Sequence, residues 1–311
     1  MAAPRITVLT PSYNQAHYLE ATIRSVLEQG YPALEYMVLD GGSTDGSPDI
    51  IKGHADRLAF WASEPDGGQA AALNKGFSRA TGDLLGWINS DDQLLPGSLA
   101  ALAEAHERHP EAILCGDSVN FDDAGREKLM RVFGLTTRNL VDRWSGLAHF
   151  HQPGVYFPRK LWERVGPLDA SLRFVFDLDW MCRALTNAEA VYLGRPIARF
   201  RVQADQKTTR EYAPFMEELR KVASRYLDVF EQPELPRVRA QLDLDAAGAE
   251  LLAGASRGAT LRAVARAIRA HPRLALSPRV ARVVAYSVAP RPVARLVERY
   301  RLHRHNLGGS A

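Results

Sequence analysis

The sequence predicts an α/β fold in which a mostly parallel central sheet is covered by helices on both faces. Short apolar runs alternate with amphipathic segments of helical spacing through the first 117 residues, an alternation typical of strands joined by crossover helices. Several runs end in polar residues, as strands do at the ligand-binding edge of such sheets. The chain of 311 residues, 46% hydrophobic and 24% charged, has the composition of a globular protein with a packed core.

The order of elements follows from the spacing of apolar residues along the chain. Short apolar runs that end at Pro, Gly or Asp predict strands, and apolar residues three or four positions apart predict helices. The expected strands cover residues 5–10, 34–39, 58–61, 83–88, 112–115, 191–193 and 197–201, and the expected helices cover residues 17–29, 69–80, 96–109, 179–185 and 212–230. Beyond Pro233 the chain becomes rich in alanine and arginine, and prolines break it into helical segments.

Composition also limits where the protein is expected to work. Its two cysteines, Cys115 and Cys182, lack the spacing of a zinc site or a disulfide framework, which suits a reducing compartment. No run approaches the roughly 18 apolar residues that a spanning helix needs. The first strand-like run stops at Pro11 and does not continue as a secretory leader. We therefore expect a cytoplasmic protein, soluble or peripheral on the inner face of the membrane.

The charge of the chain is unevenly distributed. Residues 251–311 contain twelve arginines, no lysine and one acid, Glu298, so this segment carries +11 and the preceding 250 residues carry −8. Within it, Leu261, Val264 and Ile268 form a helical apolar stripe beside a row of arginines. The pattern favours an anionic membrane surface as partner, with a protein contact or a solvated extension as alternatives. Nucleic acid is not expected, because the segment has two aromatic residues and no reading motif.

Two adjacent carboxylates follow the strand expected at residues 83–88, in the sequence Asn89-Ser90-Asp91-Asp92. Carboxylates at a strand end repel each other and are costly to desolvate unless a cation compensates them. Oxygen ligands of this kind suit Mg²⁺ or Mn²⁺, which commonly also hold the phosphates of a substrate. A solvated turn is the alternative interpretation, because Asp and Ser are ordinary turn residues.

Three further segments place polar groups after strands or before helices. Thr10 to Asn14 follows the first strand, and the lack of a Gly-x-Gly-x-x-Gly motif there disfavours a dinucleotide-dependent enzyme. Asp40 ends the second strand and is followed by two glycines that allow a ligand to approach closely. Asp66 precedes a helix start that can bind an anion, and Lys75 is a candidate phosphate partner. Each segment also has a structural interpretation, as a turn, a helix cap or a solvated lysine.

Together these segments, in this order, strongly resemble the family-2 nucleotide-sugar glycosyltransferases, whose domain has the GT-A fold with a Rossmann-like sheet. The resemblance continues through His151-Gln152-Pro153, Val165 to Asp169 and Phe176 to Trp180. It fades near residue 210 and so covers about two-thirds of the chain. By this resemblance, residues 1–232 form a glycosyltransferase domain, with a nucleotide-sugar-binding half (1–117) and an acceptor half (118–232). Residues 233–311 then form a basic helical extension.

The resemblance also implies a role for each candidate site residue. Asp177 is the general base of an inverting mechanism, with Asp179 as the alternative carboxylate. Asp92, together with Asp91, binds a divalent cation, Mn²⁺ or Mg²⁺, that bridges the diphosphate. Gln203 stands where the family often has a metal-assisting His, and because an amide oxygen carries no charge, metal affinity and metal choice are in question. The donor-side residues are Pro11, Tyr13, Asp40, Asp66, Lys75 and Asp91, and the acceptor-side residues are His151, Gln152, Asp179 and Trp180.

We therefore expect an enzyme, an inverting and metal-dependent glycosyltransferase. It would move a sugar from a nucleoside diphosphate, with UDP the expected nucleotide, to a hydroxyl of a glycan or lipid-linked saccharide in cell-surface polysaccharide biosynthesis. The alternative is a non-catalytic protein that binds sugar nucleotides or glycans on the same fold. The presence of Asp40, Asp91, Asp92 and Asp177 favours the enzyme. A nucleotidyltransferase is less favoured, because the sequence has no glycine- and lysine-rich triphosphate loop.

Overall fold

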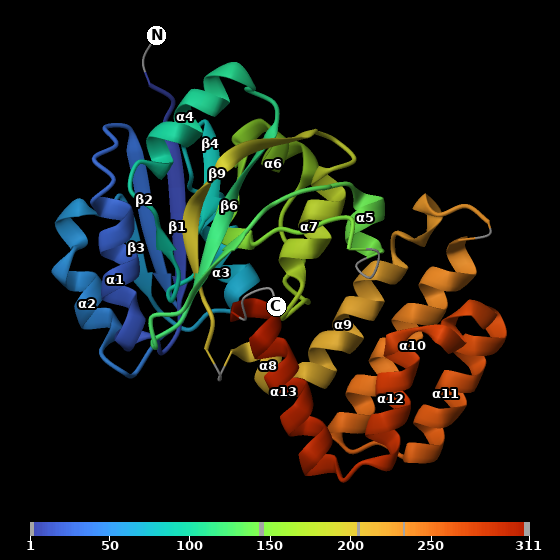
Figure 1. Cartoon of the computed structure of the whole chain (residues 1–311). Coiled ribbons are helices and arrows are strands. Elements are labelled where there is room, and N and C mark those ends of the chain that lie inside the picture. The colour runs from blue at the N-terminus through green and yellow to red at the C-terminus, as the bar shows by residue number, and fades with distance from the viewer. Residues whose placement is uncertain (1–2, 143–145, 204–205, 233, 308–311) are drawn as a thin grey trace. The chain divides into compact units, whose positions relative to one another are not determined.

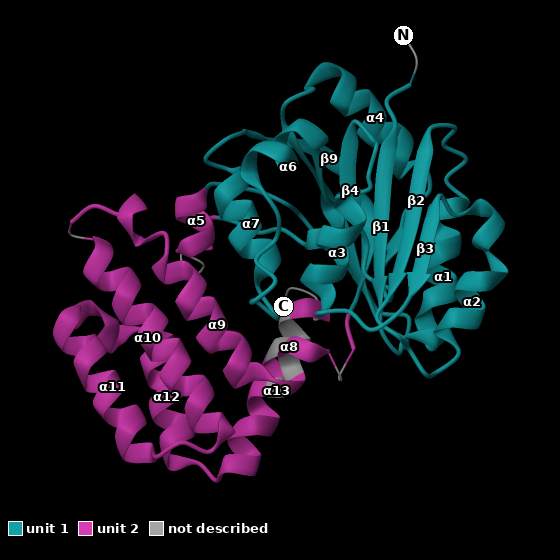
Figure 2. Cartoon of the chain, turned by 180° about the vertical axis from the view of Figure 1, so that it is seen from behind, with its two compact units in different colours: residues 1–136, 148–201 teal, residues 137–147, 202–311 magenta. Residues whose placement is uncertain are grey.

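The chain divides into two compact units (Figure 2). The computed structural model describes residues 3–142, 146–203, 206–232 and 234–307. Unit 1 consists of residues 1–136 and 148–201, and unit 2 of residues 137–147 and 202–311. Each unit is therefore assembled from two separate pieces of the chain.

A mixed β-sheet forms the centre of unit 1 (Figure 1). Its strands are β1 (Ile6–Ser12), β2 (Leu34–Asp40), β3 (Phe60–Ser63), β4 (Leu84–Trp87), β5 (Gln93–Leu94), β6 (Ile113–Phe121), β7 (Glu127–Met130), β8 (Val155–Pro158) and β9 (Ala190–Arg201). They lie in the order β3-β2-β1-β4-β8-β6-β9-β5, and β7 pairs with β6. The first four strands in this order are parallel, as the sequence predicts, whereas β8 is antiparallel to both of its neighbours.

Helices cover both faces of the sheet, which confirms the predicted α/β class. They are α1 (Ala16–Leu27), α2 (Ser47–Gly53), α3 (Gln69–Phe77), α4 (Ser98–Arg108), α6 (Arg159–Val165) and α7 (Phe176–Ala184), with the 3-10 turns η1 (Ala55–Arg57) and η2 (Gln152–Gly154). Helix α7 begins three residues before the expected start. The two strands expected at residues 191–193 and 197–201 are one strand, β9, because a register shift opposite Cys115 and Asp117 accommodates Gly194 and Pro196.

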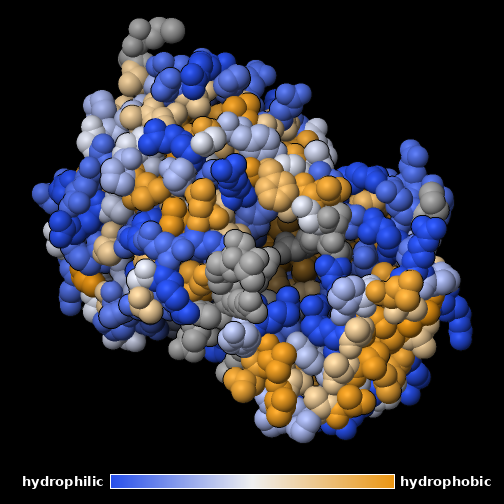
Figure 3. Space-filling view, viewed as in Figure 1, coloured by the Kyte–Doolittle hydropathy of each residue, from blue (hydrophilic) through white to orange (hydrophobic). Residues whose placement is uncertain are grey.

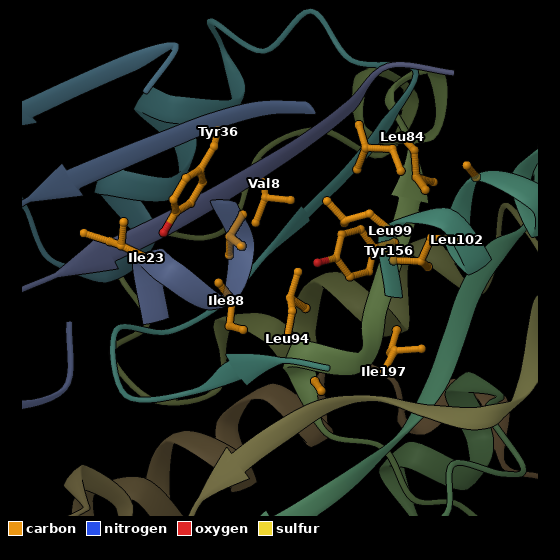
Figure 4. Close-up of a cluster of buried hydrophobic side chains, with 14 of the residues drawn as sticks. Val8, Ile23, Tyr36, Leu84, Ile88, Leu94, Leu99, Leu102, Tyr156 and Ile197 are labelled. Atoms are coloured by element: carbon orange, nitrogen blue, oxygen red, sulfur yellow. The ribbon is translucent and has the colours of Figure 1, made fainter. Parts of the chain in front are cut away.

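The alternation of side chains along each strand gives the sheet two separate cores. On one face, Val8 packs with Ile23 of α1 and Leu99 of α4 in an aliphatic cluster (Figure 4). On the other face, Leu9 lies against α3, where a Cβ added to Gly76 would come within 2.7 Å of it. Beside α3, an aromatic cluster joins α6 and α7 to the sheet through Phe77, Trp87, Phe157, Trp162 and Trp180.

The close contact between Gly86 in β4 and the ring of Tyr156 in β8 leads to a stability prediction. Tyr156 is fully buried, and a Cβ at residue 86 would lie 2.4 Å from its ring. We expect Gly86→Ala to lower the free energy of unfolding by about 1–3 kcal/mol, the usual penalty for overpacking a core. Chemical denaturation measures this change. Gly53→Ala is the matched control, because nothing lies within 4 Å of its added Cβ; equal destabilisation by both variants would contradict the packing argument.

Unit 2 is helical throughout its described residues. Its elements are α5 (Thr137–Val141), α8 (Lys207–Arg210), α9 (Tyr212–Ser224), η3 (Leu227–Val229), α10 (Glu234–Ala253), α11 (Arg257–Ala270), η4 (Pro272–Leu276), α12 (Pro278–Val288) and α13 (Arg291–Leu307). Helix α10 contributes to two cores, in which Leu244 packs with Val283 and Leu251 packs with Tyr286. Residues 234–307 therefore form a packed helical bundle.

Residues 137–147 join unit 2 through ion pairs with α10. Arg237 donates to the buried Asp142 carboxylate at 2.6 Å, and Arg138 pairs with Glu234 at 2.5 Å. The domain boundary expected between residues 232 and 233 falls inside this unit. The segment expected to form the acceptor half thus contributes α5, α8 and α9 to unit 2.

The apolar stripe expected to face a membrane on α11 belongs to the core of unit 2 instead. Val264 is buried with side chains of α10 and α12, and Ile268 packs against the same cluster. Only Leu261 of the three remains exposed. Among the described helices, none combines the length and the hydropathy needed to cross a bilayer.

Candidate functional site

The carboxyl ends of β1, β2 and β3 meet at one edge of the sheet. Ser12 is in register with Asp40, and Asp40 with Ser63. Asp40 is 3% exposed, and its carboxylate accepts hydrogen bonds from Ser43 N–H (2.8 Å), Ser43 Oγ (2.5 Å) and Ser63 Oγ (2.8 Å). Oδ2 accepts two of these bonds and Oδ1 accepts one. Oδ1 can therefore accept a further hydrogen bond from a ligand.

The turn after β1 is joined by hydrogen bonds to the loop that follows Asp40. The backbone N–H of Asn14 donates to Ser43 Oγ at 2.7 Å, and its side-chain Oδ1 accepts from Thr44 N–H at 2.9 Å. Asn14 has φ +51°, a left-handed conformation that Asn adopts more readily than most residues. The preceding Tyr13 is 63% exposed, so its ring is available to a ligand, whereas Pro11 is buried in β1.

Asp66 and Lys75, both expected on the donor side, have different surroundings. Asp66 Oδ1 accepts from Gly68 N–H at 2.7 Å, and its Oδ2 would lie 3.1 Å from a Cβ added to Gly41. The lack of a side chain at Gly41 therefore lets Asp66 approach the loop after β2. Lys75 pairs with Glu64, and this contact lowers the pKa of the Glu64 carboxyl.

The segment Asn89–Asp92 after β4, here called the carboxylate loop, holds its two acids differently. Asp92 is 1% exposed, and its oxygens accept from Arg201 N–H (2.9 Å) and from the Asn89 amide (3.1 Å). Asp91 is partly exposed. Burial, reinforced by the charge of Asp91, raises the pKa of Asp92 well above its ordinary range.

The carboxylate loop offers oxygen ligands of the kind that bind a hard divalent cation. A carboxylate whose charge is disfavoured by burial and by a second carboxylate gains most from a nearby cation. Among the described residues, no group of three or more His, Cys, Asp or Glu side chains is arranged to hold a metal ion. Ions such as Mg²⁺ often bind one or two carboxylates and take substrate phosphates as further ligands. The carboxylates of Asp91 and Asp92 fit that pattern, while Gln203 follows β9 by two residues and belongs to unit 2.

Arg201 is a site residue that the sequence analysis did not single out. It ends β9 and is 8% exposed. Its backbone N–H holds Asp92, its Nε donates to the carbonyl oxygen of Asp91 at 3.1 Å, and its guanidinium pairs with Asp123. One arginine thus fixes both residues of the acidic pair. Its place at the end of an apolar strand was the available signal.

Helix α3 connects the carboxylate loop to the segment before α7. At its start, Gln69 Nε2 donates to Asn89 Oδ1 at 2.8 Å. In its middle, Asn74 forms a reciprocal pair with the backbone of Leu168, with both bonds at 2.9 Å. Sequence reasoning missed both contacts, because a side-chain amide on a helix looks the same whether it is solvated or bonded to a distant segment.

His151 and Gln152 lie beside the end of β4. Gln152 is 8% exposed and donates from Nε2 to the carbonyl of Trp87 at 2.8 Å, while its Oε1 is buried without a hydrogen-bond partner among the described residues. His151 Nδ1 lies 2.7 Å from Ser118 Oγ, and its ring stacks on Phe200. Gln152 therefore ties η2 to the strand that leads into the carboxylate loop.

The two candidate bases on α7 differ in exposure. Asp177 lies in the first turn and is partly exposed, whereas Asp179 is 2% exposed and accepts from Arg183 Nε at 3.1 Å. Trp180, expected on the acceptor side, is fully buried and donates its indole N–H to the carbonyl of Gly166 at 3.0 Å. Trp180 therefore positions α7 and has no surface to offer an acceptor, because it fills the aromatic cluster.

Comparison with known sequences identifies the family. The sequence profile of glycosyl transferase family 2 matches residues 7–166, just over half of the chain. The uncharacterized glycosyltransferase Rv1514c of Mycobacterium tuberculosis is 30% identical over 205 residues, which are 64% of this chain and 76% of that protein.

Solved structures show the same fold. TarS 1–349 of S. aureus, determined with UDP-GlcNAc, superposes with a TM-score of 0.64 at 19% identity, over 96% of this chain and 92% of that one. The mannosyltransferase PcManGT of Pyrobaculum calidifontis, determined with GDP-Man and Mn²⁺, gives a TM-score of 0.58 at 21% identity, over 96% and 87%. The chain therefore belongs to glycosyl transferase family 2 and is a glycosyltransferase with the GT-A fold.

Proposed function

We propose that this enzyme transfers a sugar, with inversion, from a nucleoside diphosphate, UDP first among the candidates, to a hydroxyl of a glycan or lipid-linked saccharide in cell-surface polysaccharide biosynthesis. The observation that carries the proposal is the placement of Asp40 after β2 and of the carboxylate loop after β4, two strands that are parallel to β1 and lie on either side of it. The nucleotide sugars bound by TarS and PcManGT support a donor of this class.

On the donor side, we propose one role for each residue that its surroundings support. The exposed Tyr13 ring stacks on the base, and Asp40 accepts a hydrogen bond from the base or ribose, aided by Asp66. When the donor binds, Lys75 leaves its ion pair with Glu64 and pairs with a phosphate oxygen of the donor. Asp91 is the first ligand for the cation because Asp92 is buried and already accepts two hydrogen bonds.

A divalent cation, when bound, neutralises charge that develops on the leaving nucleoside diphosphate. Asp92 contributes its negative charge to that site and holds the loop through Arg201 and Asn89. Gln203 remains a candidate further ligand. The Mn²⁺ in the PcManGT structure supports an ion of this kind.

On the acceptor side, Asp177 takes the proton from the attacking hydroxyl, because it is the more exposed of the two carboxylates on α7. Asp179 holds Arg183 and acts through the position of the helix. His151 and Gln152 lie at the end of β4. There His151 is proposed to contact the acceptor or the transferred sugar, and Gln152 to hold η2 in place through its bond to the Trp87 carbonyl.

Release of nucleoside diphosphate from a panel of sugar nucleotides tests the proposal. We expect release from at least one donor in the presence of Mn²⁺ and a suitable acceptor. Calorimetric titration of the same donors gives their affinity independently of turnover. Binding of a donor without release under any divalent ion or acceptor would favour a non-catalytic sugar-nucleotide-binding protein.

We also propose that unit 2 attaches the enzyme to an anionic membrane surface on the cytoplasmic side, where a lipid-linked acceptor would be available. Residues 251–311 carry +11, and Arg262, Arg266, Arg269 and Arg273 are exposed. Each arginine near an anionic surface contributes about 1 kcal/mol, so several together suffice for reversible attachment.

A further inference from the structure

We infer that the outward face of α12 and α13 is the part of unit 2 that enters the headgroup boundary of an anionic membrane. This inference rests on the proposed membrane attachment and assigns it to particular side chains. It replaces the α11 stripe, which the core of unit 2 already uses.

The outward face of α12 is apolar along its length. The helix directs Val280, Val283 and Tyr286 into the cores of unit 2. Four exposed side chains of this helix are spaced three and four residues apart, which places them in one stripe. They are Ala281, Val284, Ala285 and Val288, and the last is 73% exposed.

Helix α13 repeats this arrangement. Ala294 and Glu298 are buried against unit 2, and Glu298 accepts a hydrogen bond from Tyr286 Oη at 2.7 Å, which fixes α13 to α12. The exposed apolar side chains of α13 again lie three and four positions apart, at Val293, Leu296, Val297 and Tyr300. Figure 3 shows apolar surface gathered over these two helices. We call the two stripes together the apolar face.

The charges around the apolar face favour anionic lipid as its occupant. Glu298 is the one acid in residues 251–311, and it is 4% exposed and paired with Arg301. Arg291 and Arg295 belong to α13 itself, and both are exposed. Exposed apolar side chains that gather on one surface, and are not scattered singly, mark an interaction site. A second copy of the chain would bring two basic surfaces together, whereas an anionic bilayer accepts both the apolar side chains and the arginines.

Vesicle co-sedimentation of the full chain tests this assignment. Wild-type protein should sediment with vesicles that contain phosphatidylglycerol, remain in solution with phosphatidylcholine vesicles, and release in high salt. The double variant Val288→Gln and Leu296→Gln changes no charge, and we expect it to bind anionic vesicles at least tenfold more weakly. The matched control is Leu129→Gln and Phe133→Gln, two apolar residues of unit 1 that are 47% and 44% exposed; it should bind as wild type does.

Each other outcome would overturn the assignment in a distinct way. Unchanged binding of anionic vesicles by the Val288 and Leu296 double variant would place the lipid contact elsewhere on unit 2. Equal sedimentation with both kinds of vesicle would show that the contact does not depend on anionic lipid. Sedimentation with neither would show that the apolar face does not bind a membrane. A dimer seen by analytical ultracentrifugation and lost in that variant would identify a second copy as the occupant. Donor binding measured on the same preparations separates these failures from a failure of the proposed enzymatic function.

Discussion

Asp177→Asn is expected to lower the rate of sugar transfer at least ~100-fold while donor binding stays intact. The amide keeps the size and polarity of the carboxylate but cannot accept the proton of the attacking hydroxyl. Initial rates at saturating donor and acceptor measure the loss, and calorimetric titration with UDP and Mn²⁺ checks that the donor site is preserved. Other nucleoside diphosphates replace UDP in the titration if UDP does not bind.

Asp179→Asn is the control from the same helix. It removes the charge opposite Arg183, whose guanidinium also holds the carbonyls of Val165 and Pro167. We therefore expect a lower melting temperature and a smaller loss of activity than in Asp177→Asn. A folded Asp179→Asn protein without activity, beside an Asp177→Asn protein with a near-native rate, would show that the base is Asp179.

The second large effect is expected on metal-dependent binding of the donor. Asp91→Asn removes the accessible charge of the carboxylate loop, and Asp92→Ala removes the acceptor of the bonds from Arg201 and Asn89. Both variants should stay folded and lose at least about tenfold in Mn²⁺-dependent affinity for UDP, since even groups that only orient metal ligands contribute that much. A chelator should reduce wild-type binding to the same level.

Asp49→Asn serves as the control for this experiment. Its side chain is 83% exposed on α2, so the same change of charge occurs away from the carboxylate loop. We expect its metal-dependent affinity to match that of the wild type. Affinity for UDP that depends on Mn²⁺ and is unchanged in Asp91→Asn and Asp92→Ala would remove the carboxylate loop as the cation site.

The elements of the first half of the chain could be predicted because their signals are local. The strand that ends at Asp40 and the strand before Asn89 are short apolar runs with polar residues directly after them. Arg201 was missed because its contacts with Asp91 and Asp92 join positions about a hundred residues apart. Its position at the end of a strand is a local signal, but that position does not show whether the side chain contacts a distant segment or faces water.

The expectations for Trp180 and for the apolar stripe of α11 were wrong for related reasons. A tryptophan beside candidate catalytic acids looks accessible in a sequence, and only the packing of α6 and α7 shows that Trp180 is enclosed. An apolar stripe on a basic helix is equally ambiguous, because it suits a bilayer and a neighbouring helix alike. Val264 is a core residue because side chains of α10 and α12, which lie elsewhere in the sequence, pack around it.

The ion pairs of Arg138 and Asp142 with α10 limit when the segment around α5 can reach its final position. Asp142 and Arg237 are 95 positions apart, and Arg138 and Glu234 are 96 apart. During synthesis, Arg138 and Asp142 cannot form these ion pairs until α10 has emerged from the ribosome. The strands β8 and β9 emerge earlier and can join the sheet before then. Unit 2 therefore cannot close before α10 has been synthesised. A premature stop within α10 would leave α5 without these ion pairs, so we expect loss of the C-terminal helices to impair folding as well as the proposed membrane attachment.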